Sequence, residues 1–217
     1  PMTAVAASST AMAAVAASST AMTAVAASST AMTAVIASST AMAAVNANDQ
    51  AVRIWMLAGT NQVYSNFASV AAVAASSTAM TAVAASSTAK MAIFNSDAAL
   101  GAIAASSTAL ATMRAATGYV VKSADVNGSA AIPGLNAGGS YILLGISSNN
   151  NPANSNPISV LTKRSGSARA NTGLLIASQS TTPTTTSPVV PLVAPFSAAD
   201  GGGTGYTWYF GLLRCDV

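Results

Sequence analysis

The side chains that usually carry out catalysis and metal binding are scarce in this sequence of 217 residues. It has no histidine, no glutamate, one cysteine and five scattered aspartates: Asp49, Asp97, Asp125, Asp200 and Asp216. Without histidine, neither a Ser-His-Asp triad nor a histidine general base can form, and the usual zinc ligand sets are excluded. A paired-carboxylate site would need the fold to bring two distant aspartates together. We therefore expect no catalytic residue, no metal and no cofactor, and we predict that the protein is not an enzyme.

Two further segments resemble binding motifs only in part. The segment 200–206, Asp-Gly-Gly-Gly-Thr-Gly-Tyr, is glycine-rich like a phosphate loop, but it lacks the Gly-Lys-[Ser/Thr] ending and precedes a predicted strand. A flexible turn is the simpler interpretation. Lys163, Arg164 and Arg169 form a basic cluster that is too small to indicate nucleic-acid binding. We expect an exposed loop there and no nucleic-acid partner.

Aromatic residues alternate near the C-terminus. Tyr206, Trp208 and Phe210 are separated by Thr207 and Tyr209, so in a strand they would share one face, with Tyr209 on the other. Packing in the core explains such a set, and a partner-docking or sugar-stacking face is the alternative. Four residues are therefore the candidate docking residues: Tyr206, Trp208, Tyr209 and Phe210.

The chain is apolar but carries little charge. Hydrophobic residues make up 52% and charged residues 6%, with a net charge of +3. Ser-Ser-Thr triplets interrupt the alanine-rich stretches, so we expect no membrane insertion. Because soluble monomers usually carry more surface charge, we expect copies of the chain or partners to cover much of this surface.

The N-terminus lacks the basic and apolar regions of a signal peptide. Pro1 is the residue that would remain after removal of an initiator methionine, so we expect synthesis in the cytosol. The single cysteine, Cys215, fits a reducing compartment, and we expect it to be buried as a small hydrophobic residue.

A ten-residue repeat dominates residues 1–116. It begins PMTAVAASST, AMAAVAASST, AMTAVAASST, AMTAVIASST, and each copy places two large residues three positions apart, such as Met12 and Val15. From Val70 onward the spacing persists but is shifted by two residues. This shift predicts a register break between Leu57 and Val63.

The period of ten does not fit one continuous helix. Ten residues at ~100° each leave the apolar stripe about 80° short of three full turns. The alanine content still favours helix, so we predict short helices broken at each triplet, for instance with Ser9 capping Thr10–Ala17. Stacked helices, two repeats to a coil, would form a slim α-solenoid-like shaft. A β-solenoid is the second interpretation, because ten is even, and disorder is the third.

Residues 117–217 change to short apolar runs separated by turn residues, which predicts a small antiparallel β-sandwich or jelly roll as a head domain. The candidate strands are Gly118–Ser123, Ser140–Ser147, Ile158–Lys163, Gly173–Ser178, Val189–Val193 and Tyr206–Arg214. Tight turns or loops are expected at Asn127-Gly128, Asn149–Asn156 and Gln179–Pro188. The predicted fold class is therefore α+β, with a repeat shaft over 1–116 and a β-rich head over 117–217.

Each repeat has only two large side chains to offset the conformational entropy of ten residues. We therefore predict an obligate homo-oligomer in which the Met/Val seam is partly buried between chains.

The repeat phrase itself resembles a known family. Tandem copies of AVAASSTAM followed by Thr or Ala, at Ala4–Ala13, Ala14–Thr23 and Ala72–Thr81, resemble degenerate repeats in structural proteins of tailed bacteriophages, such as tail fibres and related appendages. The resemblance covers roughly residues 1–116, and the C-terminal half is similar to a fibre head in general style only. It implies a virion location after assembly in the host cytoplasm and homo-oligomers that are often trimers. It also implies contacts with other virion proteins and with a host-cell receptor or glycan.

The expected function is that of a virion fibre or appendage subunit on the tail, collar or capsid, serving as spacer and docking or host-attachment module. A bacterial surface adhesin or filament subunit is the alternative, and it would need an export signal. A tailspike depolymerase is a third hypothesis, and it would need two converging carboxylates.

Overall fold

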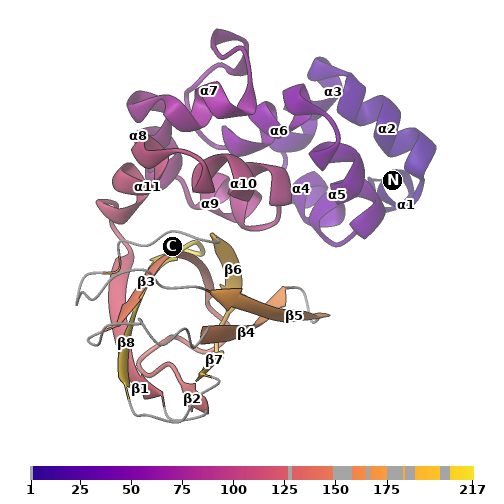
Figure 1. The fold of residues 1–217 in the computed structure, drawn as a ribbon. Helices are drawn as coiled ribbons and strands as arrows, with labels where there is room; N and C mark the ends of the chain where they lie inside the picture. Colours follow the sequence, from indigo (N-terminus) through magenta and orange to yellow (C-terminus); the bar gives the residue numbers. More distant parts are fainter. Residues whose placement is uncertain are drawn as a thin grey trace. The chain divides into compact units, whose positions relative to one another are not determined.

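The computed structural model has an α+β fold, as predicted, and divides into two compact units, Pro1–Thr112 and Met113–Val217 (Figure 1). The structure describes residues 2–126, 129–148, 158–164, 167–174, 183, 189–200 and 206–217. For residues 126, 129, 158–164, 167–174, 197–200 and 206, it describes the backbone alone.

Short helices fill the first unit. Among the described residues they are α1 (Met2–Ala7), α2 (Ser9–Ala17), α3 (Ser19–Ala26), α4 (Ser29–Ile36), α5 (Ser39–Asn46), α6 (Asp49–Met56), α7 (Val70–Ala75), α8 (Ser77–Ala85), α9 (Ser87–Phe94), α10 (Asp97–Ala104) and α11 (Ser107–Arg114), with a 3-10 turn η1 (Tyr64–Asn66). The prediction of short helices is thus confirmed, and the β-solenoid and disorder interpretations are wrong.

The first serine of each triplet ends one helix and caps the next. The Ser8 N–H donates to the Val5 carbonyl at 3.0 Å, and the Ser8 hydroxyl accepts from the Ala11 N–H at 3.2 Å. Its extended backbone, φ −99° and ψ 116°, cannot continue the helix. The cap assigned to Ser9 is therefore one residue too late, because Ser9 is already helical.

Stacked helices are three repeats apart. Helix α1 packs against α4, α2 against α5 and α3 against α6. The expected two-repeat coil is wrong because the extended serine does not reverse the chain. Helices α2 and α3 meet at a bend of 100°, so the path returns to its starting direction only after about three helices.

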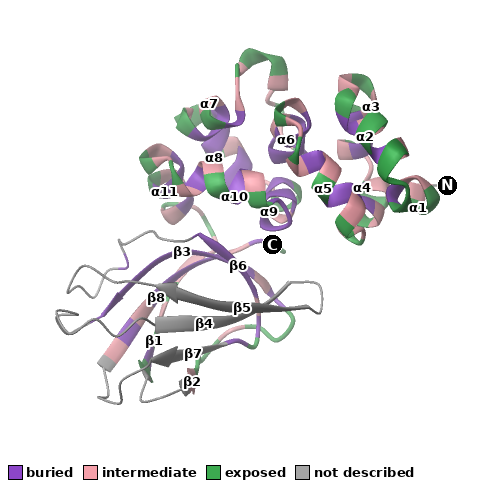
Figure 2. Cartoon of the chain, turned by 45° about the vertical axis from the view of Figure 1, so that its right-hand side comes forward, coloured by how far each residue is buried: buried purple, intermediate pink, exposed green. Residues whose placement is uncertain are grey.

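Most residues of the Met/Val pairs are buried within a single chain, and Met2, Val5 and Val15 near the N-terminus are half-buried. Met12, Met22, Val35 and Val45 are fully buried, and Figure 2 shows buried residues on the inner sides of the helices with exposed ones outside. Stacking of helices three apart covers these side chains within one chain. Partial burial of the seam between chains stays a prediction.

The helices are interrupted at the place of the predicted register break, over a longer segment than expected. Helix α6 ends at Met56 and α7 begins at Val70, so the segment 57–69, which contains η1, interrupts the helices. Gly59 has φ +69°, and a Cβ there would lie 2.7 Å from the Thr88 Cβ. Only glycine fits both the backbone conformation and the space.

The second unit is built from antiparallel strands. They are β1 (Tyr119–Val126), β2 (Ser129–Ala131), β3 (Ser140–Ser148), β4 (Ile158–Arg164), β5 (Ser167–Leu174), β6 (Val190–Val193), β7 (Ser197–Asp200) and β8 (Tyr206–Arg214). One sheet has the order β1-β8-β3-β6 and the other β2-β7-β4-β5.

Most predicted strands are present, but some bounds differ. The strand Tyr206–Arg214 matches β8, whereas the predicted Gly118–Ser123 extends to Val126, because β8 pairs with β1 as far as that residue. The predicted strand Gly173–Ser178 overlaps β5 at Gly173 and Leu174, and the rest of it lies outside the described residues; β5 itself starts at Ser167 and forms a ladder with β4. Strands β2 and β7 were not predicted, because their Ser/Ala sequences show no apolar alternation. The predicted turns 127–128 and 149–156, and all of 179–188 except Pro183, lie outside the described residues.

The core of the second unit lies against the first sheet. It contains large side chains from β3, β6 and β8 together with residues of the adjoining segments. Its most deeply buried members include Leu143, Leu192, Phe210 and Leu212. The predicted burial of Cys215 is confirmed, since its side chain is 0% exposed.

Candidate functional site

The aromatic residues of β8 separate into two faces. Trp208 and Phe210 are 2% and 0% exposed and belong to the hydrophobic core, so core packing is the correct interpretation for them and they are unavailable to a partner. Tyr209 points from the opposite face and is half-buried. The side chain of Tyr206 lies outside the described part of the chain. Of the four candidate docking residues, Tyr209 alone is described as accessible.

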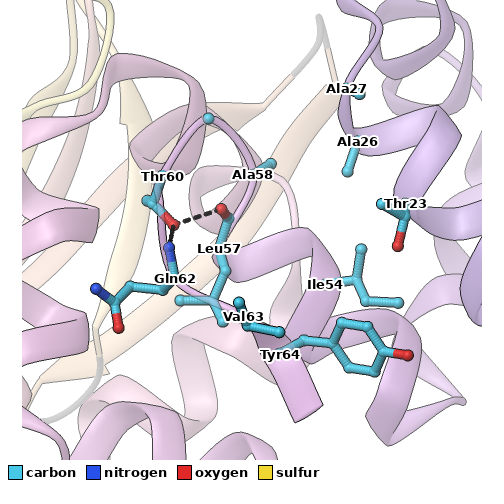
Figure 3. A pocket seen from close by; sticks show the side chains of 11 residues that line it. Thr23, Ala26, Ala27, Ile54, Leu57, Ala58, Thr60, Gln62, Val63 and Tyr64 are labelled. Atoms are coloured by element: carbon cyan, nitrogen blue, oxygen red, sulfur yellow. Dashed lines mark hydrogen bonds between the residues drawn. The ribbon is translucent and has the colours of Figure 1, made fainter. Parts of the chain in front are cut away.

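A hollow of about 310 Å³ lies in the helical unit at the register break. Figure 3 shows Thr23, Ala26 and Ala27 on one side and Leu57, Ala58 and Val63 on another, with Ile54 between them. The first three residues belong to the end of α3, and the others come from α6 and the segment 57–69. The hollow therefore lies between a regular repeat and the irregular segment 57–69.

Two charged residues hold the irregular segment in place. Arg53 pairs with Asp49 through Nε and Oδ2 at 2.8 Å, and its Nη1 donates to the Phe67 carbonyl at 2.5 Å. The guanidinium also lies over the Tyr64 ring, 5.9 Å from its centre. Asp49 Oδ1 accepts from the Val70 N–H at 3.0 Å, at the start of α7. These contacts fix both the 3-10 turn and the point where the helices resume.

The wall of the hollow is also fixed by Thr60. Its Oγ1 donates to the Leu57 carbonyl at 2.7 Å and accepts from the Gln62 N–H at 3.2 Å. Val63, at the rim, is 54% exposed although it is aliphatic. The lining contains no charged residue. Its polar side chains are the hydroxyls of Thr23, Thr60 and Tyr64 and the amide of Gln62, so such a surface can hold small neutral groups.

The aspartates with described side-chain contacts have separate partners. Asp49 contacts Arg53, Asp125 accepts from the Thr207 hydroxyl at 2.6 Å, and Asp216 pairs with Arg214 at 2.9 Å. Among the residues that the structure describes, no three His, Cys, Asp or Glu side chains gather into a metal-binding group. These contacts are those of structural ion pairs and caps.

Two pairs of ionisable groups in the second unit have shifted pKa values. The hydrogen bond from Arg214 lowers the pKa of Asp216, and the same bond raises the pKa of Arg214. Burial raises the pKa of Tyr119 and lowers that of Arg114, which donates to the Leu144 carbonyl. The hydrogen bonds show what the two arginines do: Arg114 holds the backbone of β3, and Arg214 holds the end of the chain.

The hollow is the feature that sequence reasoning missed. The sequence signals an irregular segment, because residues 57–69 lack the Ser-Ser-Thr triplet and contain Gly59, Tyr64 and Phe67 in an otherwise small-residue repeat, but it does not signal a hollow. The break was inferred from spacing alone. Spacing shows that the register slips but not whether the slipped segment fills the space beside α3.

No family model matches the chain, and no curated protein sequence matches it. Within the described ranges, no single helix is long and apolar enough to cross a membrane. The α2–α3 pair reaches that length and composition together, but it is bent by 100°.

Proposed function

We propose that this protein is a structural subunit of a bacteriophage virion, a fibre or appendage component of the tail, collar or capsid. The helical unit is the spacer and the β-rich unit is the docking or host-attachment module. Its partners are further copies of itself, most often three in such fibres, other virion proteins, and a host-cell receptor or glycan. The protein is not an enzyme. It spans a distance and binds partners through its surface.

The observation that carries this proposal is the repetitive, nearly uncharged helical array. Four charged residues occur in residues 1–112: Asp49, Arg53, Lys90 and Asp97. Arg53 and Asp49 pair with each other, and Lys90 is buried. A surface of alanine, serine and threonine supports self-association, because identical uncharged surfaces do not repel one another.

The proposal includes the finer architecture of both units. The helical unit is an α-solenoid-like shaft, supported by the regular packing of helices three apart. The β-rich unit is a small antiparallel sandwich, supported by two four-stranded sheets and an apolar core. Tyr209 is the accessible aromatic residue at which the docking module would contact a partner.

Immunogold electron microscopy tests the location. Antibodies against the purified protein should label particles from lysates of cells that carry the gene, and they should leave the surface of intact cells unlabelled. The alternative function, a bacterial adhesin or filament subunit, predicts the reverse pattern. Label on the cell envelope with none on particles would therefore replace the virion proposal with the adhesin.

A further inference from the structure

We propose that the hollow at the register break receives the first turn of α2 from a second copy of the chain. This turn runs from Ser8 to Ala11. The inference rests on the self-assembly in the proposed function and identifies the two surfaces that meet.

The chain itself contains the contact that serves as the precedent. The Ser38 hydroxyl, at the N-cap of α5, donates to the Ala6 carbonyl in the last turn of α1 at 2.6 Å. The Ser106 hydroxyl, before α11, donates to the Ala74 carbonyl of α7 at 2.8 Å. Both bonds span 32 residues. Two capping serines therefore bond to the end of the helix four places earlier.

Among the described residues this contact is absent between Ala26 and residue 58 at the break, as it is between Ala16 and Asn48 in the regular part. The residue 32 positions after Ala26 is Ala58, which has no hydroxyl, and the segment after it is not an α-helix. Within the described residues, no hydrogen bond reaches the Ala26 carbonyl. Ala26 is half-buried, whereas its equivalents Ala6 and Ala16 are buried at 1% and 2%. The hollow thus occupies the place that a helix N-terminus takes elsewhere in the array.

At the start of α2, the hydroxyl of the capping serine donates no bond to an earlier helix among the described residues of its own chain. The Ser8 oxygen accepts from the Ala11 N–H, but its hydroxyl proton has no acceptor among the described residues. Ser8 is exposed, whereas the equivalent Ser18, Ser28 and Ser38 are half-buried. Ala11 is half-buried, as are the equivalent Ala21 and Ala31, whereas Ala41 is fully buried. One copy therefore offers a hydroxyl donor and small side chains, and the hollow of another offers a mainly apolar wall that includes Ala26.

Size and charge are compatible with this pairing. The hollow measures about 310 Å³, and the residues at positions 8–11 are Ser, Ser, Thr and Ala, all small and uncharged. Exposed Val63 at the rim would be covered by the incoming turn. Because the two surfaces differ, the contact is heterologous, and such a contact can close into a ring, including a ring of three.

Light scattering and sedimentation velocity on the full chain, over a concentration series, test this pairing. Ala27→Lys places a charge in the hollow, at the exposed C-cap of α3 where lysine is compatible with a helix end. Ala47→Lys is the matched control, because Ala47 is the exposed C-cap of α5 and does not line the hollow. We expect Ala27→Lys to weaken association at least about ten-fold and Ala47→Lys to leave it unchanged.

A second pair of variants tests the donor side. Ser8→Asp keeps an N-cap acceptor but removes the hydroxyl donor, whereas Ser8→Thr keeps both. We expect the first to weaken association at least about ten-fold and the second to preserve it. Wild-type association that neither Ala27→Lys nor Ser8→Asp weakens would overturn this interface and leave self-assembly standing. A wild type that remains a 21.1 kDa monomer throughout would overturn both.

Discussion

The helical unit and the β-rich unit bury their apolar side chains by different routes. In the helical unit, a pair of large residues recurs every ten residues, and many helices pack both on the next helix and on the one three places away. In the β-rich unit, Trp208 and Phe210 lie on β8, which pairs with β1 and β3 from the start of the unit. The contact between Asp125 and Thr207 spans 82 residues, compared with 32 for Ser38 and Ala6.

This difference shows where each unit can tolerate change. A repeat array distributes its stability over nearly equivalent contacts, so the loss of one is local. A sheet whose first and last strands are paired closes a long loop, and few of its core positions have a duplicate elsewhere. The break at 57–69 is the exception in the helical unit, because its contacts occur once.

The largest expected effect would be a truncation in the β-rich core. Phe210→Ala removes a fully buried ring and should lower the free energy of unfolding of this unit by about 3–5 kcal/mol. Val25→Ala, at a repeat position that is 6% exposed, should cost about 1.5–3 kcal/mol. Urea unfolding followed by near- and far-ultraviolet circular dichroism measures both.

The two variants should also differ in how far through the structure their effect on hydrogen exchange spreads. Hydrogen exchange should show Phe210→Ala increasing exchange across all strands, and Val25→Ala increasing it mainly in α2–α4 and α6, around its own helix. If Val25→Ala instead raised exchange evenly through α1–α11, the helical unit would be as cooperative as the sheet and the contrast between the units would fail.

A smaller effect is expected for the capping serines. Ser38→Ala removes both a helix cap and the bond to the Ala6 carbonyl, and it should cost about 1–3 kcal/mol. Ser8→Ala removes only the cap and should cost about 0.5–1 kcal/mol. Thermal unfolding of the two variants at low concentration isolates the bond between stacked helices, and equal costs would show that this bond adds nothing.

The two units also differed in how far the sequence predicted them. The helices and the break follow from local chemistry, since a serine cap acts within three residues and alanine favours helix wherever it occurs. The number of helices in one coil did not follow, because it depends on the bend at each serine. In the second unit, β8 was predicted from its aromatic alternation, whereas β2 and β7 consist of residues that show no strand pattern.

Some features of the candidate site could likewise be predicted from the sequence, and others could not. The burial of Trp208 and Phe210 and the different face of Tyr209 follow from the period of two in a strand. The hollow could not be predicted, because it is a space left where one helix of an otherwise regular array does not form. Its walls come from residues about 30 positions apart, Ala26 and Ala58 among them, and no local pattern connects them.

The smallest expected effect concerns pH and the C-terminus of the β-rich unit. Arg214 Nε donates to Asp216 Oδ1 at 2.9 Å, and this bond is the main cause of the lowered pKa of the carboxyl. A carboxyl whose pKa is lower in the folded state binds fewer protons there than in the unfolded chain. The stability that it contributes is therefore fully present above its unfolded pKa and is lost as the pH falls through the folded pKa.

An NMR titration of the Asp216 carboxyl carbon should give a midpoint below the ordinary aspartate value, and Asp216→Asn should remove the corresponding acid-dependent change in exchange of the Cys215 amide. That amide donates to the Ser140 carbonyl at 2.8 Å and so reports whether the chain end stays on β3. Lys122→Gln, on the neighbouring strand β1, is the control for a general change in charge. The pair is partly exposed, and exposed pairs contribute little, so the effect should be confined to the last residues. Acid-induced exchange along the whole of β8 would instead indicate that the sheet as a unit depends on this carboxylate.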